Sequence, residues 1–228
     1  GTGKRAFRFQ QGPIFTNLLL ADELNRTPPK TQAALLEAMQ ERTVSYAGTT
    51  YTLPAPFFVL ATQNPIEQAG TYPLPEAQLD RFLLHVRVDY PSEAEERDIL
   101  AQTTGSHSGM VPKVMDAEAV LALQAAVREV HIGADLLTWI TRLVRATRPG
   151  NGAPSEVNNW IKWGAGPRAG QSLVLASKAR ALLHGRFAAT REDVQALAAP
   201  VMRHRLLLSF AAEAEQKSAD DVIAALLR

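Results

Sequence analysis

Two short apolar runs limit the fold of this chain more than any other feature. Residues 14–21 read IFTNLLLA and residues 57–62 read FFVLAT, and polar side chains stand at the end of both runs. Apolar runs of about four to eight residues are typical of strands that are buried on both faces of a sheet. The sequence therefore predicts two strands of a buried, parallel sheet.

The segment between these runs, TPPKTQAALLEAMQERTV at 27–44, predicts a helix. We expect Thr27 to cap this helix and the two prolines that follow to form its first turn. Four apolar residues at helical spacing form a stripe along it: Ala34, Leu35, Ala38 and Met39. The order of strand, helix and strand is the crossover connection that parallel strands require.

Further elements extend this first half of the chain. Residues 44–53, VSYAGTTYTL, alternate in polarity around Ala47-Gly48 and predict a small hairpin. A short helical piece, PEAQLDRF, leads into FLLHVRVDY at 82–90, which predicts a third strand. Three strands with helical connections predict an α/β fold with a partial parallel sheet.

The pattern becomes entirely helical after Pro91. Ser92 and Glu95 have the spacing of a capping box, and four more segments with helical periodicity follow. We therefore expect a boundary near residue 91, with an α/β domain at 1–91 and an all-helical domain at 92–228. Residues 149–167, PGNGAPSEVNNWIKWGAGP, predict one long loop, and a loop of that length is often functional.

Composition excludes several classes of site. The chain has 228 residues, no cysteine and a net charge of +1, so disulfides, thiolate metal sites and a strongly basic nucleic-acid-binding surface are not expected. We find no signal peptide and no apolar run long enough to cross a membrane. These features lead us to expect a cytoplasmic protein that is not bound to a membrane.

Polar side chains follow both predicted strands. Asp22 and Glu23 come after the first, and Gln63 and Asn64 come after the second. Ligands of parallel sheets bind at the carboxyl ends of the strands, so we expect these side chains to lie side by side. Hydrolysis of a phosphoanhydride needs a carboxylate near Mg²⁺, a base for the water and a polar side chain that holds the water or the γ-phosphate. The alternative is that Asp22 and Glu23 only begin a turn and cap the next helix.

Two arginines could complete such a site. Arg81, in QLDRF, could contact a phosphate or could simply pair with Asp80. Arg168 follows Pro167 in the first turn of a predicted helix, where the helix dipole disfavours a cation by roughly 0.3–1 kcal/mol unless an anion is near. A phosphate would be a suitable anion. By contrast, we interpret the basic cluster MRHRL at 202–206 as a solvated helix face.

A phosphate-binding loop should precede the acidic pair, and the only upstream segment of that kind is GTGKR at 1–5. It resembles the end of the motif G-x-x-x-x-G-K-[ST], but Arg5 stands where the motif has Ser or Thr. The preceding strand and the first glycine of the motif are also missing. We therefore expect residues 1–4 to be a polar loop and the chain to be a fragment that starts after its own phosphate loop.

Three long segments together resemble the MoxR family of AAA+ ATPases. They are LLLADELNRTPPKTQAALLEAMQER, FFVLATQNPIEQAGTYPLPEAQLDRF and WGAGPRAGQSL. The resemblance implies that Asp22 and Glu23 are the Walker B pair, with Asp22 at the metal and Glu23 as the catalytic base. It also implies that Asn64 is sensor 1 and that Arg81 is an arginine finger for the neighbouring subunit. Arg168 then matches sensor 2, and residues 92–228 resemble the helical lid.

The resemblance implies an ATPase that uses ATP and Mg²⁺ and assembles as a homo-oligomeric ring, a hexamer. Members of the family are regarded as chaperone-like remodellers that help to mature or activate partner complexes. The alternatives are an ATPase subunit like that of magnesium chelatase, or an interaction module that kept the fold and lost hydrolysis. A nucleic-acid motor is not expected, because the hairpin SYAGTTYT is not basic.

Overall fold

The computed structural model describes residues 9–64, 70–105 and 111–228. The chain forms two compact units. The first contains the residues up to Arg81 together with Ala117–Leu123, and the second contains Phe82–Asp116 and Gln124–Arg228. Residues 1–4, which the sequence predicts to be a polar loop, lie outside the described residues.

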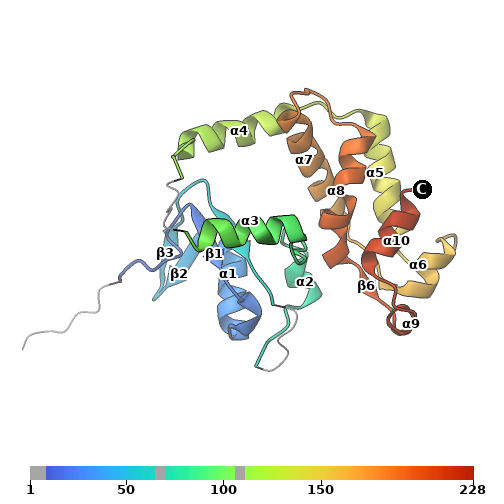
Figure 1. The fold of residues 1–228 in the computed structure, drawn as a ribbon, viewed down its shortest axis with the longest axis horizontal. Helices are drawn as coiled ribbons and strands as arrows, with labels where there is room; N and C mark the ends of the chain where they lie inside the picture. The colour runs from blue at the N-terminus through green and yellow to red at the C-terminus, as the bar shows by residue number, and fades with distance from the viewer. Residues whose placement is uncertain (1–8, 65–69, 106–110) are drawn as a thin grey trace, which may run out of the picture. The chain divides into compact units, whose positions relative to one another are not determined.

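The first unit contains the predicted crossover (Figure 1). Strand β1 (Leu18–Ala21) pairs in parallel with β4 (Phe58–Ala61), in a register that sets Leu18 opposite Phe58 and Ala21 opposite Ala61. Between them the chain forms a short 3₁₀ helix, η1 (Leu24–Arg26), and the helix α1 (Pro29–Glu41). The parallel pair and the helical crossover are therefore confirmed.

The details of α1 differ from the prediction. The residue at its N-cap position is Pro28, and the Thr27 hydroxyl instead donates to the carbonyl of Leu24 at 2.7 Å. The expectation that Thr27 caps α1 is therefore wrong, because this hydroxyl closes the preceding turn. The buried face of the helix also differs in part from the predicted stripe, since Ala34 is exposed and the buried residues are Gln32, Leu35, Leu36 and Ala38.

The predicted hairpin is confirmed. Strands β2 (Thr43–Tyr46) and β3 (Thr49–Thr52) are antiparallel, and the turn residues Ala47 and Gly48 both have positive φ, at 48° and 79°. Positive φ at both central residues matches the twist of the two strands that a two-residue turn connects. Helix α2 (Glu76–Leu79) also lies in this unit, within the predicted helical piece.

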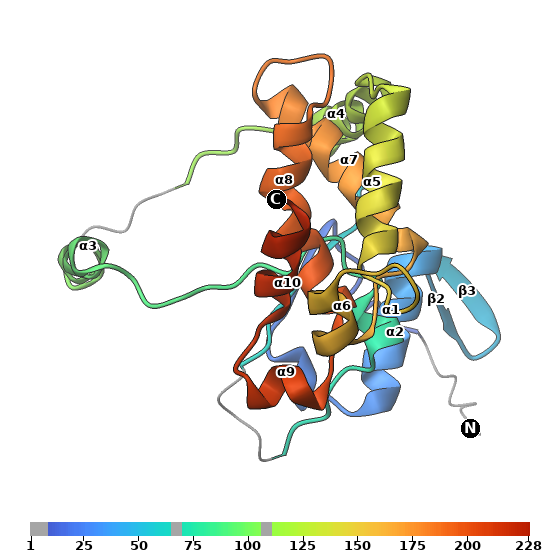
Figure 2. The ribbon, with the colours of Figure 1, turned by 90° about the vertical axis from the view of Figure 1, so that its right-hand side faces the viewer.

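Among its described residues, the second unit has many helices and one short pair of antiparallel strands, β5 (Ile161–Trp163) and β6 (Leu207–Leu208). Figure 2 shows α5, α7, α8 and α10 as neighbours, and their packing buries Leu173, Val194 and Met202 completely. Helix α4 contributes residues to both units. The helices are α3 (Glu93–Thr103), α4 (Ala117–Glu129), α5 (Ala134–Ala146), α6 (Ser155–Trp160), α7 (Pro167–Leu183), α8 (Arg191–Met202), η2 (Arg203–Arg205), α9 (Phe210–Ala214) and α10 (Ala219–Leu226).

Two predictions of secondary structure for this part of the chain are wrong. Residues 149–167 are not one long loop, because α6 and β5 lie within them. Residues 82–90 form no strand. Side chains at 203–205 contact the backbone carbonyls of Phe82, Leu83 and His85, so these carbonyls do not enter a strand ladder.

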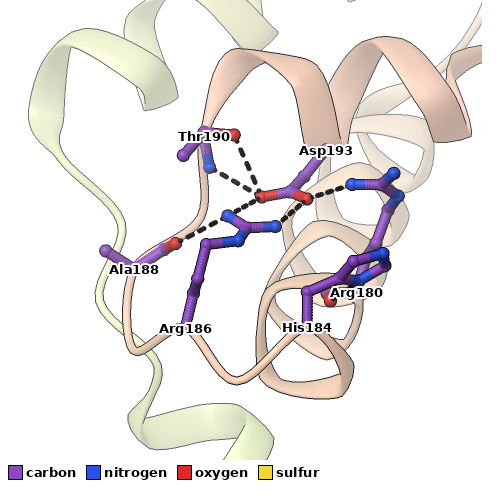
Figure 3. Close-up of polar contacts among 6 residues, drawn as sticks. All are labelled: Arg180, His184, Arg186, Ala188, Thr190 and Asp193. Atoms are coloured by element: carbon purple, nitrogen blue, oxygen red, sulfur yellow. Dashed lines mark hydrogen bonds and ion pairs between the residues drawn. The ribbon is translucent and has the colours of Figure 1, made fainter.

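A buried ion cluster fixes the start of α8 (Figure 3). Asp193 is fully buried and accepts hydrogen bonds from Arg186 at 2.5 and 2.7 Å, from Arg180 at 2.5 Å and from the Thr190 backbone at 2.9 Å. The bond from Arg186 is the main reason why the pKa of Asp193 lies far below its ordinary value, although burial opposes the shift. Since this pKa is lower in the folded state, the cluster stabilises the fold at neutral pH, and strong acid removes that contribution.

Candidate active site

The pairing of β1 with β4 brings Asp22 and Thr62 together. Each of them directly follows its strand, and the register places them opposite each other. The Thr62 hydroxyl donates to Asp22 Oδ1 at 2.6 Å and accepts from the backbone N–H of Glu23 at 2.8 Å. One hydroxyl therefore fixes both the carboxylate of Asp22 and the backbone of Glu23.

The turn after Asp22 has an unusual backbone. Glu23 adopts a left-handed conformation, with φ 49° and ψ 48°, which is uncommon for a residue other than glycine. Such a conformation costs roughly 1–3 kcal/mol and persists only where neighbouring contacts enforce it. Here the next N–H, that of Leu24, donates to the Thr62 carbonyl at 2.9 Å, and the Leu24 side chain is buried. Contacts with Thr62, the residue that follows β4, thus hold the turn.

The carboxylate of Glu23 makes no capping hydrogen bond to η1, although Glu23 occupies the N-cap position. It pairs with Arg26 at 2.9 Å, and 39% of the Glu23 side chain remains exposed. An exposed pair of this kind contributes only about 0–1 kcal/mol. A water molecule or a ligand can therefore displace Arg26 at little energetic cost.

Asn64 lies two residues beyond Thr62 and is half-buried, while Gln63 between them is exposed. Asp22, Glu23 and Asn64 all belong to the first unit. The structure thus places Asp22 and Glu23 directly after β1, and Asn64 three residues after the end of β4.

Arg81 follows α2 in the first unit and is exposed. Its Nη1 atom lies 3.5 Å from the carbonyl of Leu36 in α1, which is a long contact for a hydrogen bond. This contact leaves most of the donor capacity of the guanidinium for another group.

Arg168 belongs to the second unit, in the first turn of α7, as predicted. Pro167 occupies the start of this helix, and the first turn contains no acidic residue. Gly166 at the N-cap position has no side chain that could accept from the backbone N–H groups. The helix start therefore presents N–H donors beside an exposed cation, an arrangement that favours an anion.

A cavity of about 330 Å³ lies beside β1, with a mainly apolar lining. Asp22 lines it, together with residues of α1 and β2, but neither Glu23 nor Asn64 does. This cavity therefore does not collect the side chains that we assign to phosphate chemistry.

Sequence reasoning did not identify Thr62, although a signal was available. The two runs LLLAD and FVLAT are equivalent in length, and their last residues, Asp22 and Thr62, hold equivalent positions. From the sequence we expect Asp22 and Glu23 to lie beside Gln63 and Asn64, and not beside Thr62. The register of β1 and β4 then establishes that Thr62 lies opposite Asp22.

Among the described residues, no helix has the length and apolar character needed to span a membrane.

Comparisons with known proteins match both parts of the chain. Residues 2–84 match the model of the ATPase family associated with various cellular activities (AAA), and residues 155–226 match the model of the AAA lid domain. A crystal structure of a protein from Cytophaga hutchinsonii is 40% identical and superposes with a TM-score of 0.89, over 96% of this chain and 67% of that one.

Relatives with names are similar over almost the whole chain. "Chaperone MoxR1" from Mycobacterium tuberculosis is 42% identical over 99% of this chain and 60% of its own length. "Protein MoxR" from Paracoccus denitrificans is 32% identical over 92% of this chain and 67% of its own length. The chain thus spans between three fifths and two thirds of these curated relatives. Its two matched domains and these relatives show that the chain belongs to the MoxR family of AAA+ ATPases.

Proposed function

We propose that this chain carries the hydrolytic part of a MoxR-like ATPase that couples ATP hydrolysis to chaperone-like remodelling of partner protein complexes. The observation that carries the proposal is the pair of hydrogen bonds made by the Thr62 hydroxyl. This hydroxyl follows β4 and holds both the carboxylate of Asp22 and the left-handed turn at Glu23, which follow the parallel strand β1. A constrained acidic turn at this edge of a parallel sheet suits phosphate chemistry.

Glu23 acts as the base in this proposal. Its exposed carboxylate can exchange Arg26 for a water molecule and orient that water toward the γ-phosphorus. As the water oxygen forms a bond to phosphorus, the bond to the oxygen that bridges to the β-phosphate breaks, and Glu23 accepts the proton of the water. Asn64, at the end of the neighbouring strand, supplies an amide to hold the water or the γ-phosphate.

The residues present fit a magnesium ion at Asp22. Thr62 donates to one oxygen of this carboxylate, which fixes its orientation and leaves further lone pairs for a hard cation. Thr62 itself offers its hydroxyl beside the carboxylate. When bound, Mg²⁺ neutralises charge on the β- and γ-phosphates.

The two arginines act from different subunits in this proposal. Arg81 reaches the nucleotide of the neighbouring subunit in a homo-oligomeric ring, which we propose to be a hexamer, and Arg168 approaches the nucleotide of its own subunit from the lid. Both residues are exposed, which supports these roles. The remaining support for these two roles comes from the AAA+ family, whose members typically form rings.

We propose a protein complex as the client. The hairpin β2–β3, residues 43–52, carries no lysine or arginine, whereas a strand of nucleic acid would be gripped by basic side chains. The name of the mycobacterial relative, a chaperone, agrees with a protein client.

Isothermal titration with Mg-ATP tests the proposal. We expect the full-length protein to bind Mg-ATP and to hydrolyse it, and residues 1–228 alone to bind it poorly because they contain no G-K-[ST] sequence. Micromolar affinity for residues 1–228 alone would show that the phosphate site is misplaced. No hydrolysis by the full-length protein would contradict the proposed activity.

Thr62→Val should slow ATP hydrolysis by the full-length protein. The substitution preserves the shape of the side chain but removes the bond to Asp22 and the acceptor for the Glu23 N–H. A hydrogen bond to a charged group contributes about 1.5–3 kcal/mol, so we expect roughly a 10- to 100-fold lower rate. Thr62→Ser keeps the hydroxyl and is the matched control. Equal steady-state rates for Thr62→Val and the wild type would rule out the bridging role.

A further inference from the structure

Residues 82–88, which we term the linker, are attached through their backbone to the end of α8. The N–H of His85 donates to the carbonyl of Pro200 at 2.7 Å, and Arg203 Nη1 donates to the carbonyl of His85 at 3.2 Å. His204 Nε2 lies 3.1 Å from the carbonyl of Phe82. The earlier interpretation of residues 202–206 as a solvated helix face is therefore wrong, because these side chains contact the linker.

Arg205 makes the most extensive contacts of this group. It is 8% exposed, and its guanidinium bonds with acceptors on three elements. In the linker it donates to the carbonyls of Phe82 at 2.7 Å and Leu83 at 3.4 Å. It also donates to the hydroxyl of Ser172 in α7 at 3.2 Å and to the carbonyl of Val201 in α8.

These contacts have a physical cause. A guanidinium stays charged at any ordinary pH, so burial is tolerable only where several acceptors surround it. The last carbonyls of a helix have no partner within the helix, and those of Pro200 and Val201 accept from His85 and Arg205 instead. The end of α8 and the linker thus satisfy each other's polar groups.

The partners of Arg205 lie close in the chain to Arg81 and Arg168, the two arginines that we propose to contact nucleotide. Phe82, whose carbonyl accepts from Arg205, is bonded directly to Arg81 in the chain. Ser172 lies four residues after Arg168 in α7, and residues four apart lie on the same face of a helix. One buried guanidinium therefore joins the helix of Arg168 to the residue that follows Arg81.

We propose that Arg205 is a positioning residue that holds the linker against α7. A movement of the helix that carries Arg168 is then transmitted to the backbone that begins directly after Arg81. This inference rests on the proposed function, in which these two arginines contact nucleotide. Arg205 itself touches neither substrate nor metal in this account, and it acts through the placement of Arg81.

Hydrogen exchange of the full-length protein without nucleotide tests the anchoring. In Arg205→Met we expect the peptide that contains His85 to exchange at least about tenfold faster, while peptides of α7 and α8 keep their protection. Arg205→Lys keeps a cation but lacks the planar fork, so it should release the linker in part. Arg87→Ala is the matched control. Arg87 pairs with Asp220 at 3.5 Å, and Asp220 keeps its bond from Arg203 at 3.0 Å when Arg87 is replaced, so this variant should exchange like the wild type.

Steady-state kinetics test the transmission to Arg81. Misplacement of a catalytic group can lower a rate by about 100-fold, so we expect kcat of Arg205→Met to fall by roughly 10- to 100-fold while KM for ATP stays within about twofold. A residue with a purely structural role would instead lower the fraction of folded protein and expose α7 and α8 to exchange. Arg205→Lys should show an intermediate kcat.

Three results would overturn the inference. The first is wild-type exchange of the His85 peptide in Arg205→Met, and the second is a released linker with wild-type kcat. The third is loss of protection throughout α7 and α8 in both Arg205→Met and Arg205→Lys, which would make Arg205 a residue that only stabilises the fold. A wild-type protein without ATPase activity would refute the proposed function instead. The exchange experiment would still decide whether Arg205 anchors the linker.

Discussion

Replacing Arg81 with alanine in the full-length protein is expected to lower the rate of ATP hydrolysis by about 10³- to 10⁵-fold. An arginine finger stabilises negative charge that develops in the transition state, so its removal should affect kcat far more than nucleotide binding. Arg81 is exposed, and its one long contact with the Leu36 carbonyl contributes little to the fold. The variant should therefore fold normally, and steady-state phosphate release measures the loss.

Mixed rings decide whether Arg81 acts across a subunit interface. Arg81→Ala subunits should regain partial activity when an excess of Glu23→Gln subunits is added, because some interfaces then join an intact base to an intact finger. Arg168→Ala subunits should be rescued less, since their defect lies in the subunit that holds the nucleotide. Equal rescue of both variants, or no rescue of Arg81→Ala in rings shown to be mixed, would contradict the interface assignment.

Sequence patterns predicted correctly those helices and strands that are determined by residues within them or next to them in the chain. The crossover from β1 through α1 to β4 follows from apolar runs and helical periodicity, and the hairpin follows from Ala47-Gly48 at its turn. Pro167 marked the start of α7 correctly. In each case the residues that determine the element lie within it or beside it in the chain.

Some failures are local, such as the Thr27 hydroxyl, which bonds to the Leu24 carbonyl three residues earlier instead of capping α1. The others concern residues whose partners are distant in the sequence. Residues 82–90 have the composition of a strand. Their backbone, however, forms hydrogen bonds with the Pro200 carbonyl and with the side chains of His204 and Arg205, and not with a neighbouring strand. The basic cluster that binds them looks solvated in isolation, since nothing beside Arg205 in the sequence indicates that it is buried. Thr62 was missed because its importance depends on strand register. The domain boundary near residue 91 and the roles of the site residues stay predictions.

Glu23→Gln should preserve ATP binding and abolish turnover in the full-length protein. Glutamine has nearly the same shape as glutamate, so the turn held by Thr62 should persist, but the amide cannot accept the proton of the attacking water. General base catalysis contributes about 10²- to 10⁴-fold, and we expect a loss of at least this size. The salt bridge with Arg26 is also lost, but this exposed pair has little effect on stability.

The most direct test measures Mg-ATP binding and single-turnover phosphate release in the same preparation of Glu23→Gln. Glu41→Gln, at the exposed end of α1, is the matched control for the loss of one carboxylate. We expect wild-type binding by both variants, with phosphate release abolished in Glu23→Gln and unchanged in Glu41→Gln. Wild-type phosphate release by Glu23→Gln would contradict the account and leave Glu23 as a residue that only shapes the turn after β1.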